Sequence, residues 1–181
     1  MDSIMHPYIP IVLGTARKGR QSEHVAQYIY NTLKNNKEAI FELVDVRNYL
    51  VESRTIPPWE NSNIAKPWRD IVAKSSAFIF VVPEYNRGYP GEFKMLLDQE
   101  FKGYNKKPAL IVSVSSGGFG GVRMAEHLIP TLRYMGFHLL SQDIQVPKVE
   151  EFVKMSMEEK DQTLKEKIEK MVDALIEKKN D

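Results

Sequence analysis

The sequence predicts an α/β protein with a parallel sheet of five strands that is covered by helices on both faces. Short apolar runs recur along the chain and alternate with segments whose apolar residues have helical spacing. These runs are apolar throughout, which is typical of strands that are buried on both faces. Strands that alternate with helices are joined by crossover connections, and such connections make neighbouring strands parallel.

The composition is that of one globular domain, which we expect to span residues 1–181. Hydrophobic residues make up 43% of the chain and charged residues 27%. The formal net charge of +1 gives no general attraction to nucleic acid, so we expect no nucleic-acid partner. We also expect a cytoplasmic location and no membrane partner, because the N-terminus does not resemble a signal peptide and no apolar run approaches the ~20 residues of a membrane span.

The chain contains no cysteine, which excludes disulfides, thiolate nucleophiles and sulfur-ligated metals. Any redox chemistry must therefore use a bound cofactor. The four histidines show no spacing that is typical of metal ligands, and we expect no metal site.

The first part of the chain predicts a strand, a helix and a second strand. Residues Tyr8–Leu13 form an apolar run that ends at Gly14, and helical spacing begins at Ser22, which can serve as the N-cap. Residues 40–46 form the second apolar run. The polar, proline-bearing connection 47–66 is unusually long for a compact domain, and we interpret it as a possible lid.

The middle of the chain predicts two further strands. A short helix begins at Pro67, and the third strand covers residues 77–82. After a polar and aromatic loop, a helix begins at about Gly91 and carries Phe101 on its apolar face. Residues Pro108–Val114 form the fourth strand.

The last part of the chain predicts a helix, a fifth strand and a final helix. Pro130 falls inside the first of these helices, so we expect a kink or break just before it. Gly136 suits the end of this helix, and residues 137–146 carry the fifth strand. The final helix begins with a capping box of Ser156 and Glu159 and should cover one face of the sheet.

Five parallel strands are most simply arranged in the order 2-1-3-4-5 of flavodoxin-like folds. In such sheets ligands bind at the carboxyl ends of the strands, near the point where the strand order reverses. Three predicted loops converge there, at residues 14–21, 83–90 and 115–121. Their residues should therefore indicate the ligand.

The first loop, G-T-A-R-K-G-R-Q-S, has the features of a phosphate site. It joins a buried strand to the N-terminus of a helix, where free N–H groups and the helix dipole favour an anion. Thr15, Arg17 and Ser22 add hydroxyl and guanidinium donors. A nucleotide-triphosphate loop is not indicated, because Arg20 and Gln21 stand where G-x-x-x-x-G-K-[ST] requires lysine and a hydroxyl residue.

The second loop indicates a site for a planar ring. It places the aromatic residues Tyr85 and Tyr89 beside Asn86 and the backbone of Pro83 and Glu84. A flat apolar surface next to hydrogen-bonding groups suits a heterocycle with polar edges.

The third loop, S-S-G-G-F-G-G, is glycine-rich where a backbone has to approach a ligand closely. Gly117 and Gly118 could direct N–H groups at a developing negative charge. One phosphate, one ring and one close backbone approach together indicate a mononucleotide. FMN is the mononucleotide that performs redox chemistry without cysteine or metal.

Three segments in this order resemble the NADPH-dependent FMN reductase family, which includes chromate, quinone and azo reductases. They are G-T-A-R-K-G-R-Q-S, V-V-P-E-Y-N-R-G-Y-P-G-E-F-K-M-L-L-D and S-S-G-G-F-G-G-V-R. The resemblance covers nearly the whole chain and implies a flavodoxin-like fold, bound FMN and a homodimer or homotetramer. Arg87 stands where the family often has a small or neutral residue, and we include it among the cofactor-binding residues. The full predicted set is Thr15, Arg17, Arg20, Gln21, Ser22, Pro83, Glu84, Tyr85, Asn86, Arg87, Ser115, Gly117 and Gly118.

The resemblance implies electron transfer from NADPH, or NADH, through FMN to a quinone or a similar acceptor. The flavin would supply the chemistry, so no side chain is assigned as catalytic. Two alternatives remain open. The first is a flavodoxin-like electron carrier or flavin-binding regulatory protein without nicotinamide turnover, which the net charge of +1 disfavours because carriers tend to be strongly acidic. The second is a phosphate-binding hydrolase, for which the sequence offers no identifiable nucleophile and base.

Overall fold

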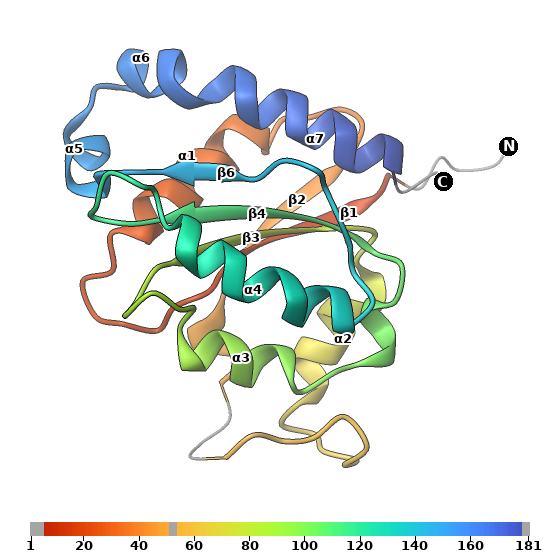
Figure 1. Cartoon of the computed structure of the whole chain (residues 1–181). Helices are drawn as coiled ribbons and strands as arrows, with labels where there is room; N and C mark the ends of the chain where they lie inside the picture. The colour runs from red at the N-terminus through yellow and green to blue at the C-terminus, as the bar shows by residue number, and fades with distance from the viewer. Residues whose placement is uncertain (1–5, 51–53, 179–181) are drawn as a thin grey trace, which may run out of the picture.

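The core of the protein is a parallel β-sheet (Figure 1). The computed structural model describes residues 6–50 and 54–178. Within them the strands lie in the order β2-β1-β3-β4-β5, and each pair of neighbouring strands is parallel, which confirms the predicted order. The strands are β1 (Tyr8–Leu13), β2 (Ile40–Asp45), β3 (Phe78–Pro83), β4 (Pro108–Val114), β5 (His138–Leu139) and β6 (Ile144–Val146).

The predicted fifth strand over residues 137–146 is corrected to two short strands. β5 pairs with the start of β4, where His138 lies opposite Pro108, and β6 pairs with its end, where Ile144 lies opposite Val112. The chain advances six residues from 138 to 144 but only four from 108 to 112, so two extra residues interrupt the pairing. An outer strand tolerates such a bulge because it has no further neighbour on that side.

Helices cover both faces of the sheet, as predicted (Figure 1). One face carries α1 (Ser22–Leu33), α5 (Val149–Lys154) and α7 (Glu166–Lys178), and the other carries α2 (Lys66–Lys74), α3 (Gly91–Leu97) and α4 (Val122–Tyr134). Successive residues of β3 point to opposite faces. Ile79 and Val81 pack with the first group of helices, whereas Phe78, Phe80 and Val82 pack with the second. Burial on both faces explains why this strand is apolar throughout.

The predicted break at Pro130 is absent, because α4 continues to Tyr134. A proline cannot donate to the carbonyl four residues earlier, here that of Glu126. Both residues are exposed, so water can satisfy this carbonyl. Gly136, with φ of 90°, follows the C-cap residue of α4 and confirms the predicted end of the helix.

Two other predicted helices differ in extent. α3 ends at Leu97, so Phe101 does not belong to its apolar face and is 41% exposed. The capping box of Ser156 and Glu159 is confirmed. It opens the short α6 (Met157–Lys160), which continues through a π-helical turn (Asp161–Lys165) into α7. Short 3-10 helices occur at Val46–Asn48 and Lys102–Tyr104.

The long connection 47–66 is fastened to the body of the protein where it is described. Its residues 51–53 lie outside the described chain. The guanidinium of Arg69, on α2, donates hydrogen bonds to the carbonyls of Pro57 at 3.1 Å and Glu60 at 2.8 Å. The lid interpretation therefore stays a prediction.

Across the described residues, no helix is both long enough and apolar enough to span a membrane.

Candidate functional site

The three loops meet at the carboxyl edge of the sheet and enclose a pocket of about 250 Å³. The first loop contributes Arg17, Arg20 and Gln21 of the predicted cofactor-binding residues to the pocket wall, and the start of α1 contributes Ser22. The other two loops contribute Pro83, Glu84, Tyr85 and Ser115. The remaining predicted residues, Thr15, Asn86, Arg87, Gly117 and Gly118, lie outside this wall.

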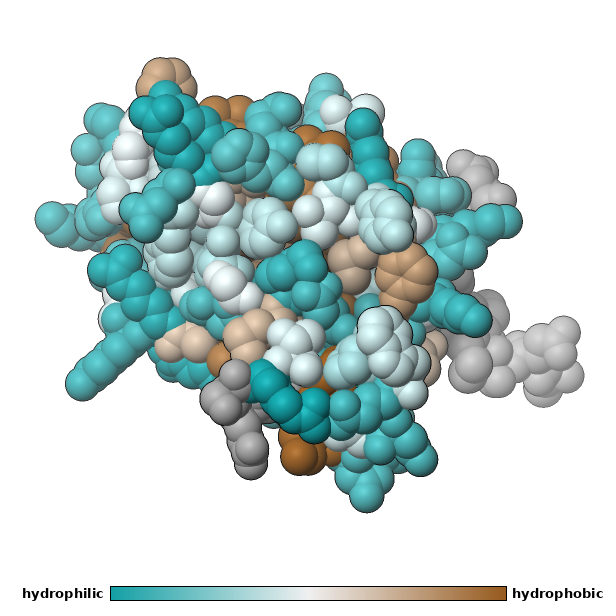
Figure 2. Space-filling view, turned by 60° about the horizontal axis from the view of Figure 1, so that its bottom comes forward, coloured by the Kyte–Doolittle hydropathy of each residue, from teal (hydrophilic) through white to brown (hydrophobic). Residues whose placement is uncertain are grey.

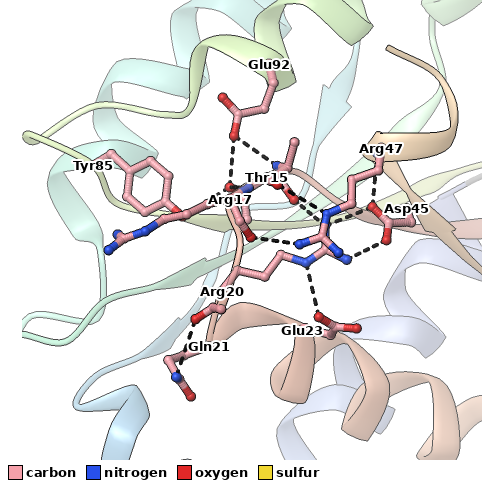
Figure 3. A network of polar contacts seen from close by, with 11 residues as sticks. Thr15, Arg17, Arg20, Gln21, Glu23, Asp45, Arg47, Tyr85 and Glu92 are labelled. Carbon is pink, nitrogen blue, oxygen red and sulfur yellow. Dashed lines mark hydrogen bonds and ion pairs between the residues drawn. The ribbon is translucent and has the colours of Figure 1, made fainter.

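Thr15 is fully buried and connects the first loop to two other segments (Figure 3). Its hydroxyl donates to Glu92 Oε1 at 2.9 Å and lies 3.1 Å from the hydroxyl of Tyr85. Its oxygen also accepts a hydrogen bond from the N–H of Arg17 at 3.3 Å. The N–H of Ala16 donates to the same Glu92 oxygen at 2.9 Å. The first loop is thus held against the second loop and the first turn of α3.

Arg20 is a buried part of the first loop, with only 4% of its surface exposed. Its guanidinium faces the end of β2, where Nη1 donates to Asp45 Oδ1 at 2.8 Å and Nη2 donates to Asp45 Oδ2. Nη1 also donates to the carbonyl of Thr15, and Nε donates to Glu23 at 3.3 Å. Figure 3 shows these contacts around one guanidinium. Arg20 therefore fixes the shape of the loop, and its predicted contact with the cofactor stays a prediction.

The ion pair of Arg20 and Asp45 changes the pKa values of both groups. Burial alone raises the pKa of the Asp45 carboxyl, but hydrogen bonds from Arg20 and from the N–H of Arg47 outweigh it and lower the pKa overall. Burial lowers the pKa of Arg20, but the hydrogen bonds to Asp45 and Glu23 and the negative charges of these two residues together outweigh burial and raise it. Each group thus stabilises the charged form of the other.

Arg47 supports the same loop from outside. Its guanidinium donates to the carbonyl of Ala16 at 3.2 Å and to that of Arg17 at 2.8 Å. Asp45 ends β2 and Arg47 lies in the short 3-10 helix that follows it, so this end of β2 fixes the first loop through two side chains. The segment 47–66, interpreted as a lid, therefore begins with a residue that shapes the first loop.

Ser22 is the first residue of α1, so its predicted role as the N-cap is wrong, and Gln21 holds that position. The hydroxyl of Ser22 lies in the pocket wall. The residue is 2% exposed, and its Oγ has no hydrogen-bond partner among the described residues. Arg17, also in the wall, is exposed and places its guanidinium 5.4 Å from the centre of the Tyr85 ring. The N-terminus of the helix, the buried hydroxyl of Ser22 and the exposed cation of Arg17 together favour an anion.

The second loop is a tight turn that is anchored at both ends. The backbones of Tyr85 and Gly88 exchange two hydrogen bonds of 2.9 Å, and the two residues between them, Asn86 and Arg87, have positive φ of 50° and 65°. Both central residues are exposed. The carboxylate of Glu84 accepts from the N–H of Met124 at 3.3 Å, so this side chain caps the start of α4.

Tyr89 is turned away from the pocket. Its hydroxyl lies 3.1 Å from Thr131 Oγ1, and its ring packs against the cluster beneath α4. Ring surface for a ligand at this edge therefore comes from Tyr85.

Two contacts with the start of α5 fix the position of the third loop. The Ser116 hydroxyl donates to Glu150 at 2.7 Å, and the N–H of Lys148 donates to the carbonyl of Gly117 at 3.1 Å. Gly117 and Gly118 are exposed, and a Cβ built on Gly118 would meet nothing within 4 Å. The backbone here is accessible to a ligand.

Residues 7–151 match the family described as NADPH-dependent FMN reductase. The chain belongs to this family. Its relatives include the NAD(P)H-dependent FMN reductase LOT6 of Saccharomyces cerevisiae, which is 26% identical over 148 residues, 73% of this chain and 76% of the relative. A quinone reductase of Pseudomonas putida is 32% identical over 119 residues, which are 62% of each chain.

A solved structure confirms the fold of this FMN reductase family member. The flavoenzyme FerB of Paracoccus denitrificans, an NAD(P)H:(acceptor) oxidoreductase, superimposes with a TM-score of 0.73 over 96% of this chain and 97% of its own. Because the two sequences are only 18% identical, this likeness shows the flavodoxin-like architecture alone.

Three residues that shape the site of this family member were missed in the sequence. Asp45 and Arg47 stand at the carboxyl end of β2, and Glu92 stands in the first turn of α3. The position of Asp45 at a strand end was a usable signal, because charged side chains at this edge of a parallel sheet face the loops. No sequence signal distinguished Glu92 from a solvated acid at a helix start.

Proposed function

We propose that this protein is an FMN-dependent NAD(P)H oxidoreductase that passes electrons from NADPH, or NADH, through bound FMN to quinones or similar acceptors. Membership of the NADPH-dependent FMN reductase family supports the cofactor and the donor. The quinone reductase name of the Pseudomonas relative supports the class of acceptor. A cytoplasmic location is proposed with it, because a chain without cysteine needs no oxidising compartment.

The observation that carries the proposal is the hydroxyl of Ser22 in the pocket at the start of α1, which has no hydrogen-bond partner in the part of the chain that the structure describes. Buried polar groups in proteins are normally hydrogen-bonded, so this donor fits a pocket whose ligand brings its own acceptor. The FMN phosphate would accept from Ser22 and from Gln21, and the exposed guanidinium of Arg17 would pair with it. Thr15 and Arg20 would not contact the phosphate in this arrangement but would fix the shape of the loop that carries Arg17 and Gln21.

The isoalloxazine ring would extend from this pocket along the second and third loops. Tyr85 and Ser115 offer side chains in the pocket wall, and the exposed backbone at Gly117 and Gly118 offers N–H groups without obstruction by side chains. Bound FMN supplies the transfer of hydride and electrons. The chain's part is to bind and orient the ring, and the N–H groups of Gly117 and Gly118 would face negative charge at its edge.

A visible spectrum and a steady-state assay test the proposal. The purified protein should show flavin absorption after incubation with FMN and should oxidise NADPH when a quinone is added. An electron carrier or regulatory protein would bind FMN without oxidising NADPH. Failure to bind FMN, or FMN binding without quinone-dependent NADPH oxidation, would contradict the proposal.

We also propose that the protein forms a homo-oligomer, with a dimer as its smallest unit. A wide groove of about 1030 Å³ runs between the connection near Trp59, α3 and the end of α4. Trp59 is 85% exposed and Tyr134 is 82% exposed on its walls. Figure 2 turns this side of the molecule forward and shows hydrophobic patches between hydrophilic side chains. Exposed aromatic side chains around a groove are typical of a contact surface between subunits.

Light scattering on the purified protein checks the oligomer. The mass should be at least twice the 20.9 kDa of one chain, and Trp59→Ser should shift it toward one chain. Phe119→Ser is the matched control, because Phe119 is 70% exposed but lies outside the groove. A wild-type mass of 20.9 kDa would contradict the oligomer.

A further inference from the structure

Glu92 holds an unexpected place for an acidic residue, because it contacts the loop that is proposed to bind a phosphate (Figure 3). One carboxylate oxygen, Oε1, accepts both the Thr15 hydroxyl and the Ala16 N–H, each at 2.9 Å. A negative charge beside an anion site weakens anion binding by repulsion. The contact therefore needs a benefit that outweighs this repulsion.

The two hydrogen bonds fix the direction of a chain of hydroxyl groups. Thr15 has a single hydroxyl hydrogen, and it is donated to Glu92. The 3.1 Å contact between the hydroxyls of Thr15 and Tyr85 then requires Tyr85 to be the donor. The N–H of Arg17 donates to the same Thr15 oxygen at 3.3 Å. Glu92 thus sets the direction of donation in a row of hydrogen bonds, in which Tyr85 donates to Thr15 and Thr15 donates to the carboxylate.

This chain links the two ends of the proposed cofactor site. Tyr85 and Arg17 both line the pocket, and the Arg17 guanidinium lies 5.4 Å from the centre of the Tyr85 ring. Without the acceptor at Glu92, the buried Thr15 hydroxyl would lose its acceptor and the Ala16 N–H its partner. Both groups would then reorient, and Tyr85 and Arg17 would lose their fixed positions.

We propose that Glu92 is a positioning residue for FMN, which rests on the proposed function. Its carboxylate holds Thr15, and through Thr15 it holds Tyr85 and Arg17 in the arrangement that receives the cofactor. The two hydrogen bonds require an oxygen that accepts them at the position of Glu92 Oε1, but they do not require a negative charge there. Glutamine keeps a carbonyl oxygen that can accept both hydrogen bonds, whereas alanine removes the acceptor.

The test compares FMN binding to cofactor-free wild-type protein, Glu92→Gln and Glu92→Ala, measured by the quenching of flavin fluorescence. Glu92→Ala should weaken FMN binding about tenfold, and Glu92→Gln should stay within about threefold of the wild type. Tyr85→Phe should also weaken binding, and adding it to Glu92→Ala should cost little more, because both changes interrupt one chain. The thermal midpoint of each cofactor-free variant shows that the fold is retained.

Several results would overturn the inference. Glu92→Ala that binds FMN as well as the wild type, or better, would show that repulsion outweighs positioning. Equal weakening by glutamine and alanine would show that the charge acts and not the acceptor. Fully additive losses in the double variant would show that Glu92 and Tyr85 act separately. Wild-type protein that binds no FMN would overturn the proposed function itself. Wild-type protein that binds FMN, with variants that behave otherwise than expected, would overturn only the role of Glu92.

Discussion

Replacing Arg20 by alanine should lower the free energy of unfolding by about 2–4 kcal/mol. Removing one partner of a buried ion pair typically costs about 3–5 kcal/mol, and the effect here is reduced because the Asp45 side chain is 28% exposed. The change leaves the Asp45 carboxylate without its guanidinium and the Thr15 carbonyl without its donor. Urea unfolding of the cofactor-free protein measures the loss.

Arg17→Ala is the matched control for this substitution, because it removes an exposed arginine from the same loop. Its free energy of unfolding should stay within about 0.5 kcal/mol of the wild type. Its affinity for FMN should fall, whereas its affinity for riboflavin, which lacks the phosphate, should be nearly unchanged. If Arg17→Ala destabilises the protein as much as Arg20→Ala, the division of roles between the two arginines is wrong.

The dependence on pH provides a second measurement of the Arg20 effect. The folded-state pKa of Asp45 is lowered, so its ion pair contributes stability above the unfolded pKa of about 3.9. This stability is lost as the pH falls through the folded pKa, because protonated Asp45 no longer needs a cation. The difference between wild type and Arg20→Ala should therefore be full at neutral pH and shrink as the pH falls below about 4. A difference that persists unchanged at low pH would assign the effect to packing.

The location of the site could be predicted from the sequence, whereas the tasks of individual loop residues could not. Burial on both faces makes a strand apolar throughout, so strand ends and their loops are visible in the sequence. Arg17 and Arg20, however, look alike in G-T-A-R-K-G-R-Q-S. Arg20 is buried because Asp45, on the neighbouring strand, lies within its reach. That pairing depends on the register of β1 and β2, which no local pattern records.

The same limit explains the errors in the fold. Residues 137–146 are apolar at both ends, and the pattern does not reveal that two extra residues separate β5 from β6. Pro130 has the local chemistry of a helix breaker, but its exposure on α4 lets water satisfy the carbonyl that it leaves without a donor. Exposure and pairing are properties of the folded chain, and they decided both outcomes.

Replacing Gly120 by alanine should lower the free energy of unfolding by about 2–4 kcal/mol and weaken FMN binding. Gly120 has φ of 61°, a conformation that costs a residue with a side chain about 1 kcal/mol or more. An added Cβ would lie 2.7 Å from the Cβ of Gln145 and 3.1 Å from the backbone nitrogen atoms of Val146 and Pro147. The Gly120 carbonyl also accepts the buried Ser113 hydroxyl at 2.7 Å. The loop would have to move away from β6, which displaces residues 115–119.

Gly118→Ala separates ligand contact from loop strain, because an added Cβ there meets nothing within 4 Å. Its unfolding free energy should stay within about 0.5 kcal/mol of the wild type. If the ring of FMN lies against this backbone, Gly118→Ala should weaken FMN and riboflavin by the same factor. Arg17→Ala, at the phosphate end, should weaken the binding of FMN but not that of riboflavin.

Two results would contradict these expectations. A Gly118→Ala protein that binds both flavins like the wild type would place the ring elsewhere. A Gly120→Ala protein with the stability of the wild type would show that the loop can move without a cost in free energy.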